Sequence, residues 1–201
     1  IEVSMGERTV FVGGRVFTLD PTLGDLERAD VLIEDSVILA IGPSLGVTDA
    51  HAVDVSGKLL MPGMIDSHRH TWQTALRGLG ADWTVLDYLA AVRMKLAPAF
   101  TADDVYWSSH AGALEALDHG VTTVVDYAHC INSVEHAEAG LRAFEDSGAR
   151  GVFSYGFASN DAPSEDRFGS HGQRLAQARA LASRGGRESS RVQLGVALTE
   201  M

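Results

Sequence analysis

The side chains best suited to chemistry in this chain are His68 and His70, two imidazoles separated by one residue. They follow the apolar run Leu59–Asp66, which predicts a buried strand. On an extended strand alternate side chains point the same way, so we expect both imidazoles on one face, with Asp66 beside them and Arg69 opposite. Two imidazoles on one face can offer nitrogen to one metal ion at roughly 2.0–2.1 Å. The spacing therefore predicts two metal ligands; the alternative is a chance H-x-H on a surface loop.

Further candidates follow the first two predicted strands at their carboxyl ends, where parallel α/β folds place their active sites. Trp72, Gln73, Asp82 and Trp83 lie in the long connection after the first strand, and His129 follows the second. A tryptophan can stack on a flat heteroaromatic ring, and the Gln73 amide can both donate and accept hydrogen bonds. We predict these five residues as substrate contacts. The alternative is that the tryptophans pack the loop and that His129 is an ordinary loop histidine or supports the site from behind.

Alternating strands and helices have to position these side chains. Thr101–Gly120 predicts a helix, because Thr101 can cap its start and Gly120 suits its end. Short connections in a β-α-β-α order predict a parallel sheet with helical crossovers, either an open doubly wound sheet or a barrel. The first turn lacks G-x-G-x-x-G, which disfavours a dinucleotide site. The other predicted elements are Val121–Asp126, Ser133–Ser147, Arg150–Phe157, Ser170–Ala182 and Val192–Leu198.

The region before residue 59 has a different character and predicts a small all-β unit. Two β-branched runs, Thr9–Val12 and Arg15–Leu19, are broken by two glycines. A hairpin is predicted where Val31–Glu34 and Val37–Ile41 flank a two-residue connection. We therefore divide the chain into a β part, residues 1–58, and an α/β part, residues 59–201.

Composition excludes several classes of function. The 201 residues contain 16 Lys+Arg against 27 Asp+Glu, a net charge of −11, which disfavours nucleic acid and a polybasic membrane contact. One cysteine excludes an internal disulfide framework. No apolar run approaches the roughly 18 residues of a membrane span, and no signal peptide is evident. These features predict a cytoplasmic protein with a packed core.

The stretch LLMPGMIDSHRH, after ADVLIEDSVILAIG, resembles the metal-dependent amidohydrolase superfamily. The next segment, HTWQTALRGLGADWTVLDYL, is similar to its chlorohydrolase and deaminase branch, and GVTTVVD is similar to the second barrel strand of that branch. The resemblance runs from residue 9 to about residue 198. It implies a (β/α)8 barrel, with only the first four βα units present here, and a small β-sandwich to which residues 1–58 contribute.

The resemblance also implies the chemistry. One divalent metal, zinc or iron, with His68 and His70 as two of its ligands, would activate water to hydrolyse a C–N bond of a small nitrogen heterocycle, by deamination or a chlorohydrolase-like reaction. The alternative reaction is hydrolysis of a cyclic amide or imidazolone. The remaining ligands and the catalytic residues of such enzymes would be expected beyond Met201. A homo-oligomer or a missing chain half is therefore expected, and the competing hypothesis is a catalytically incomplete fragment or a partner-binding half-barrel.

Overall fold

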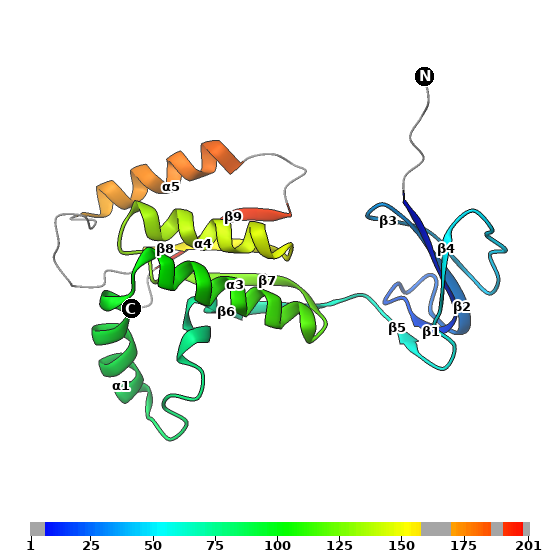
Figure 1. Cartoon of the computed structure of the whole chain (residues 1–201), viewed down its shortest axis with the longest axis horizontal. Helices are drawn as coiled ribbons and strands as arrows, with labels where there is room; N and C mark the ends of the chain where they lie inside the picture. The colour runs from blue at the N-terminus through cyan, green and yellow to red at the C-terminus, as the bar shows by residue number, and fades with distance from the viewer. Residues whose placement is uncertain (1–6, 158–169, 186–190, 199–201) are drawn as a thin grey trace. The chain divides into compact units, whose positions relative to one another are not determined.

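The computed structural model describes residues 7–157, 170–185 and 191–198 (Figure 1). The chain divides into two compact units between Pro62 and Gly63, and each unit is described by itself. No helix within the described ranges is long and apolar enough to cross a bilayer.

The described residues of the first unit form one five-stranded sheet. Its order is β3-β2-β1-β4, with β5 beside β1, and β1 pairs antiparallel with β2 but parallel with β4 and β5. Because the described part is a single sheet, the sandwich stays a prediction. The strands are β1 (Arg8–Phe17), β2 (Asp25–Glu34), β3 (Val37–Gly42), β4 (His51–Asp54) and β5 (Leu59–Leu60).

The two glycines bend β1 but do not end it, so the predicted break was wrong. Gly13 has a φ of +77°, and the register with β2 shifts between Phe11 and Gly14, as in a β-bulge. The amide of Gly13 donates to the buried carboxylate of Asp30 at 3.0 Å, which lets the strand continue through the bulge. The predicted hairpin between β2 and β3 is confirmed.

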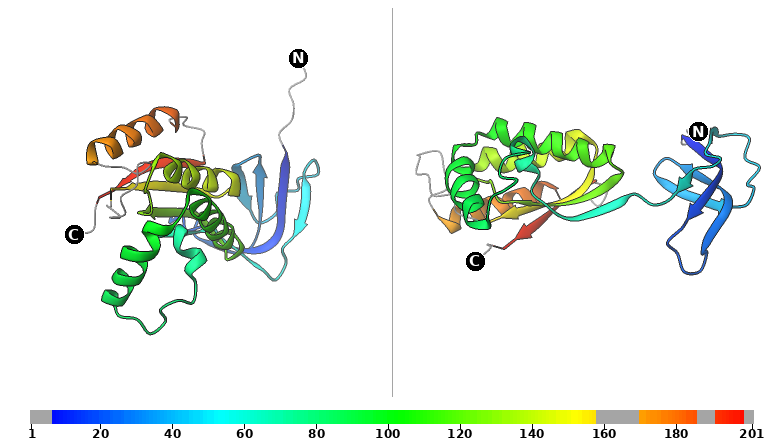
Figure 2. Two further views of the ribbon diagram at one scale, coloured as in Figure 1. Left: turned by 60° about the vertical axis from the view of Figure 1, so that its left-hand side comes forward. Right: turned by 90° about the horizontal axis from the view of Figure 1, so that it is seen from below.

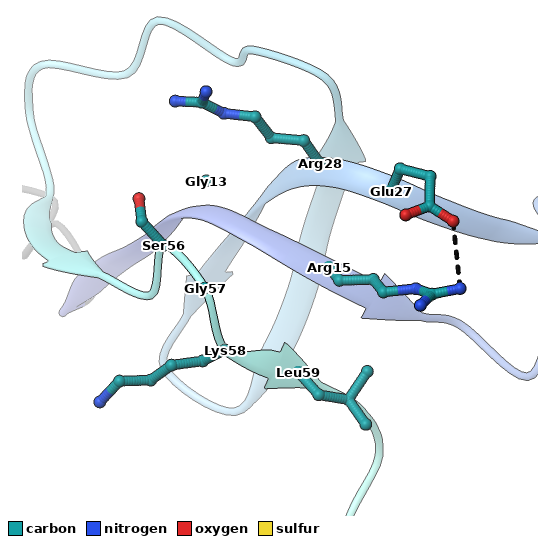
Figure 3. Close-up of a pocket in the computed structure, with 8 residues that line it drawn as sticks. All are labelled: Gly13, Arg15, Glu27, Arg28, Ser56, Gly57, Lys58 and Leu59. Carbon is teal, nitrogen blue, oxygen red and sulfur yellow. Dashed lines mark ion pairs between the residues drawn. The ribbon is translucent and has the colours of Figure 1, made fainter.

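A hollow of about 470 Å³ lies on this first unit (Figure 3). Arg15 on its rim is paired with Glu27 at 3.0 Å. The side chains of Arg28 and Lys58 extend to opposite sides of Ser56 and do not converge on one point (Figure 3). The hollow is therefore polar, but its cationic side chains do not meet at one point.

The predicted strand Leu59–Asp66 is two strands in two different sheets, which corrects the sequence-based assignment. β5 pairs with β1 in the first unit, and β6 (Met64–Arg69) belongs to the second unit. Pro62 separates them because it has no amide hydrogen for a ladder. A Cβ on Gly63 would lie 2.2 Å from the side chain of Thr122, so only glycine fits there.

The described part of the second unit is a four-stranded parallel sheet in the order β6-β7-β8-β9 (Figures 1 and 2). Strand order in space equals strand order in the chain, so the predicted parallel sheet with helical crossovers is confirmed. The remaining elements are the 3₁₀ helix η1 (Thr71–Leu76), α1 (Val85–Tyr88), the π-helical η2 (Leu89–Leu96), α2 (Ala97–Ala99), α3 (Ala102–Asp118), β7 (Val121–Ala128), α4 (Val134–Ser147), β8 (Arg150–Gly156), α5 (His171–Gly185) and β9 (Val192–Ala197).

One face of this sheet is packed by α3, α4 and α5. Val124, Phe153 and Tyr155 on this face are at most 1% exposed. They pack with small residues of α3 and with Phe144 of α4, and Figure 1 shows both helices lying along the sheet. Burial of this side of the strands forms the core of the unit and fixes the strand ends that carry the candidate residues.

Helix α3 begins as predicted. Thr101 and Asp104 form a reciprocal capping box, in which each side chain accepts from the backbone amide of the other. The buried face of the helix is centred on Ser109, Ala113 and Ala116. This arrangement places the capped end of α3 at a defined point beside the sheet.

Candidate active site

A β-bulge at the end of β6 changes which side of the sheet its side chains face. Asp66 pairs with Val124 but Arg69 pairs with Asp126, so three steps on β6 oppose two on β7. Asp66 and Arg69 therefore share the helix-packed side, where their charged groups are 3.7 Å apart and Arg69 also pairs with Glu115 of α3 at 2.9 Å. The expectation that the Asp66 side chain shares the face of the histidines assumed unbroken alternation, which the bulge interrupts, although its Oδ1 still accepts from the backbone amide of His68 at 3.2 Å.

The two predicted metal ligands do lie together. The ring centroids of His68 and His70 are 4.9 Å apart, at an interplanar angle of 82°. Nδ1 of His70 lies 2.9 Å from the carbonyl oxygen of Tyr127. A carbonyl only accepts, so Nδ1 carries the hydrogen and the neutral ring has its lone pair on Nε2. A backbone carbonyl fixing one nitrogen in this way is the usual support of a metal-binding imidazole.

Tyr127 is a residue of the site that sequence reasoning missed. Its ring centroid lies 5.8 Å from that of His68 and 5.4 Å from that of His70. Its hydroxyl donates to the carbonyl of Leu198, just after β9. Side chains alternate between the two faces along β7, so a residue next to a buried one points to the other face, where the histidines lie. This alternation was the sequence signal that could have identified Tyr127.

Asp126 was missed as well. Its buried carboxylate accepts from the backbone amide of Thr71 at 2.7 Å and from its hydroxyl at 2.9 Å. Burial raises the pKa of Asp126 to about 6, and the two Thr71 hydrogen bonds only partly oppose this. The contact holds the residue that directly follows His70, and so it fixes where η1 begins.

Trp72 and His129 lie behind the histidine pair. They are 2% and 1% exposed, and the indole Nε1–H donates to Nδ1 of His129 at 2.7 Å. The ring of His129 stacks on that of His70, with centroids 4.1 Å apart and planes 9° apart. Burial, followed by the nearby charge of Arg93, lowers the pKa of His129 to about 2, so the ring is neutral. This burial disagrees with the prediction that Trp72 and His129 contact substrate.

Two other predicted substrate residues do line a cavity, which has a volume of about 230 Å³. Gln73 lies on one wall and donates to the hydroxyl of Tyr88 at 2.7 Å. Trp83 lies against Gly80, where a Cβ would come 2.4 Å from the indole. Asp82 is exposed beside this cavity and does not line it. The other lining residues are Leu76, Leu79, Thr84, Val85 and Val92.

Two imidazoles would supply half of the ligands of a usual four-coordinate metal site. Within the described residues, no group of three or more His, Cys, Asp or Glu is arranged to hold a metal ion. His68 and His70 still fit one, because both present imidazole nitrogen and His70 has its tautomer fixed by Tyr127. His68 and His70 thus lie at the carboxyl end of the first strand of a parallel α/β sheet, the edge at which such folds place their active sites.

Residues 59–199 match the profile of the Amidohydrolase family, and the chain belongs to this family. It is 35% identical over 162 residues to a 5-methylthioadenosine/S-adenosylhomocysteine deaminase of Symbiobacterium thermophilum, covering 79% of this chain and 36% of that protein. The chain thus spans little more than a third of that curated relative.

Solved structures share the fold. One is a variant of atrazine chlorohydrolase from Arthrobacter aurescens, complexed with zinc and atraton, with a TM-score of 0.79 at 22% identity. The match covers 94% of this chain and 46% of the chlorohydrolase. Another is guanine deaminase from C. acetobutylicum with bound guanine, with a TM-score of 0.77 at 16% identity, covering 96% and 46%. At these identities the likeness shows the fold alone.

Proposed function

We propose that this chain supplies the first half of a metal-dependent hydrolase that cleaves a C–N bond of a small nitrogen heterocycle, as a deaminase or a chlorohydrolase-like enzyme. The observation that carries the proposal is the pairing of His68 and His70 at the end of β6, with the lone pair of His70 set on Nε2 by the carbonyl of Tyr127. Membership of the Amidohydrolase family supports it.

His68 and His70 would hold a divalent metal, which we propose to be zinc, as in the related chlorohydrolase structure. When bound, such an ion lowers the pKa of its water towards about 7 and so supplies hydroxide at neutral pH. The chain's own residues prepare the ligands. Tyr127 holds the tautomer of His70, and Asp126 fixes the turn that follows it through Thr71.

The cavity beside η1 and α1 is our proposed substrate subsite. The indole of Trp83 is 40% exposed and can stack on a flat ring, and the amide of Gln73 can bond a ring nitrogen or amino group. Asp82 at the exposed edge would contact a polar substituent. Relatives named for adenosine derivatives and guanine support a purine-like heterocycle as the substrate class.

We also propose the larger architecture. The four described parallel strands would be half of a (β/α)8 barrel, and the first sheet would be part of a β-sandwich. Fold likeness to about half of each related structure supports both statements. The other half of the metal site would come from chain outside these 201 residues or from a partner.

Release of ammonia from a panel of nitrogen heterocycles, together with metal content, tests this function in the complete protein. His68→Ala and His70→Ala should each reduce turnover to background and lower bound metal, because each removes a ligand. His171→Ala changes an exposed histidine of α5 and serves as the control. Turnover that survives in both ligand variants, or a wild-type protein of verified mass with neither metal nor turnover, would refute the proposal.

A further inference from the structure

Two buried aromatic side chains, Trp72 and His129, lie in series behind the ring of the proposed ligand His70. The indole donates to the first imidazole at 2.7 Å, and that imidazole stacks on the second at 4.1 Å. Trp72 packs with Val92, Ala97 and other buried residues, so its indole is fixed in the core of the loop. The series therefore connects a rigid anchor to a candidate ligand.

The indole determines the tautomer of His129. The Nε1–H of Trp72 can only donate, so Nδ1 of His129 has to be an unprotonated acceptor. A neutral ring with its lone pair on Nδ1 carries its hydrogen on Nε2. An imidazolium, with hydrogen on both nitrogens, would lose the bond to the indole.

His70 has the opposite tautomer. Its Nδ1 lies 2.9 Å from the carbonyl oxygen of Tyr127 and therefore carries the hydrogen, which puts the lone pair on Nε2. The backbone carbonyl holds one atom of the ring and fixes its tautomer, whereas contacts between rings bear on the plane of the imidazole.

The stack with His129 bears directly on that plane. Two planes only 9° apart leave the His70 ring little freedom to tilt towards His129. The bond from Trp72 in turn holds the ring of His129 in place.

We propose that Trp72 and His129 are positioning residues, which hold the imidazole of His70 in the plane that keeps its bond to the Tyr127 carbonyl and offers Nε2 to a metal ion. This inference rests on the proposed function, since it takes His70 as a ligand. It assigns the two residues a role other than substrate contact, and it explains why both are buried.

The test compares two variants of the 201-residue chain. His129→Asn keeps an acceptor near the position of Nδ1 but removes the stacked ring, and Trp72→Phe keeps the packing but removes the donor. The ¹⁵N shifts of the His70 imidazole are read in the metal-free chain, and the dissociation constant of Zn²⁺ alone is measured by chelator competition. We expect a mixture of His70 tautomers in His129→Asn, because a ring that is no longer stacked can tilt away from the Tyr127 carbonyl that fixes its tautomer. We also expect roughly 10–100-fold weaker zinc binding in both variants.

His136→Asn is the matched control. His136 is also buried, at 7% exposure, and it bonds the carbonyl of Phe100 at 2.8 Å. This variant should lose stability yet keep the His70 shifts and the zinc affinity. The inference is overturned if folded His129→Asn and Trp72→Phe keep the wild-type shifts and affinity, or if the control changes them equally. If the wild-type chain binds no zinc, the nitrogen shifts alone decide whether His129 positions His70, and the proposed function is decided separately by metal content and ammonia release in the complete protein.

Discussion

The two faces of the parallel sheet in the second unit differ in what their side chains do. On the helix-packed face, Phe153 and Tyr155 are almost completely buried. On the opposite face, Ile65 is 69% exposed, and the exposed His68 lies beside the partly buried Tyr127. The comparison teaches that one face determines stability and the other carries the candidate chemistry, because a side chain that binds a ligand has to remain accessible.

The largest effect is expected on the packed face. Phe153→Ala should lower the free energy of unfolding by about 3–5 kcal/mol, because it leaves a cavity among residues that cannot fully collapse. Urea denaturation measures this change. Zinc affinity of the folded fraction should stay at the wild-type value. A loss of stability below about 1 kcal/mol would contradict the proposed difference between the two faces, since substitutions at the surface have effects of that order.

Asp126 is the polar exception on the packed face, and its expected effect depends on pH. The carboxyl group binds a proton more readily in the folded chain, where its pKa is about 6, than in the unfolded chain, where it is 3.8. Its contribution to the free energy of unfolding therefore falls as the pH rises through this interval. Relative to Asp126→Asn, the wild type should lose on the order of 2–3 kcal/mol between these values.

Unfolding of both proteins at a series of pH values measures this difference. Asn is the suitable substitution because its oxygen can still accept from Thr71. A difference that stays constant, or that grows in favour of the wild type as the pH rises, would contradict the assignment of burial as the dominant cause.

A smaller effect is expected at the ion pairs that hold the bulge of β6. Glu115 of α3 pairs with both Arg69 and Arg77 and is partly exposed. Glu115→Gln should lower stability by about 1 kcal/mol, and the difference should shrink in high salt. Thermal unfolding at low and high salt measures it. Equal losses at both salt concentrations would show that packing, and not charge, accounts for the effect.

The smallest effect is expected on the accessible face. Ile65→Thr should change the free energy of unfolding by less than about 0.5 kcal/mol, because the side chain already meets solvent. The same denaturation experiment used for Phe153 makes the two faces directly comparable. A loss as large as that of Phe153→Ala would mean that the two faces do not differ as described.

Local signals were sufficient for much of this fold. The helix that starts after Thr101 was predicted from its cap, and the reciprocal bonds with Asp104 confirm that cap. The order of strands and helices also predicted a parallel sheet. The spacing of His68 and His70 was enough to place both rings together, since a short strand keeps them on one face even beside a bulge.

Long-range contacts account for what the sequence could not show. The bulge that turns the Asp66 side chain to the helix-packed side depends on pairing with β7. His136 is buried against the carbonyl of Phe100, although no nearby residue in the sequence marks it. In each case the deciding partner is distant in the chain, where local patterns carry no information.

The order of the strands also has a consequence for the time course of folding. Only α4 lies between β7 and β8, whereas η1, α1, η2, α2 and α3 all lie between β6 and β7. Closing a loop of twice the length costs about 0.6 kcal/mol more free energy, because more chain entropy is lost, and pairings distant in the chain form more slowly. We therefore expect the β7–β8 pair to form first on refolding, so that the histidine pair and its bulge assemble on a sheet that has already begun to form.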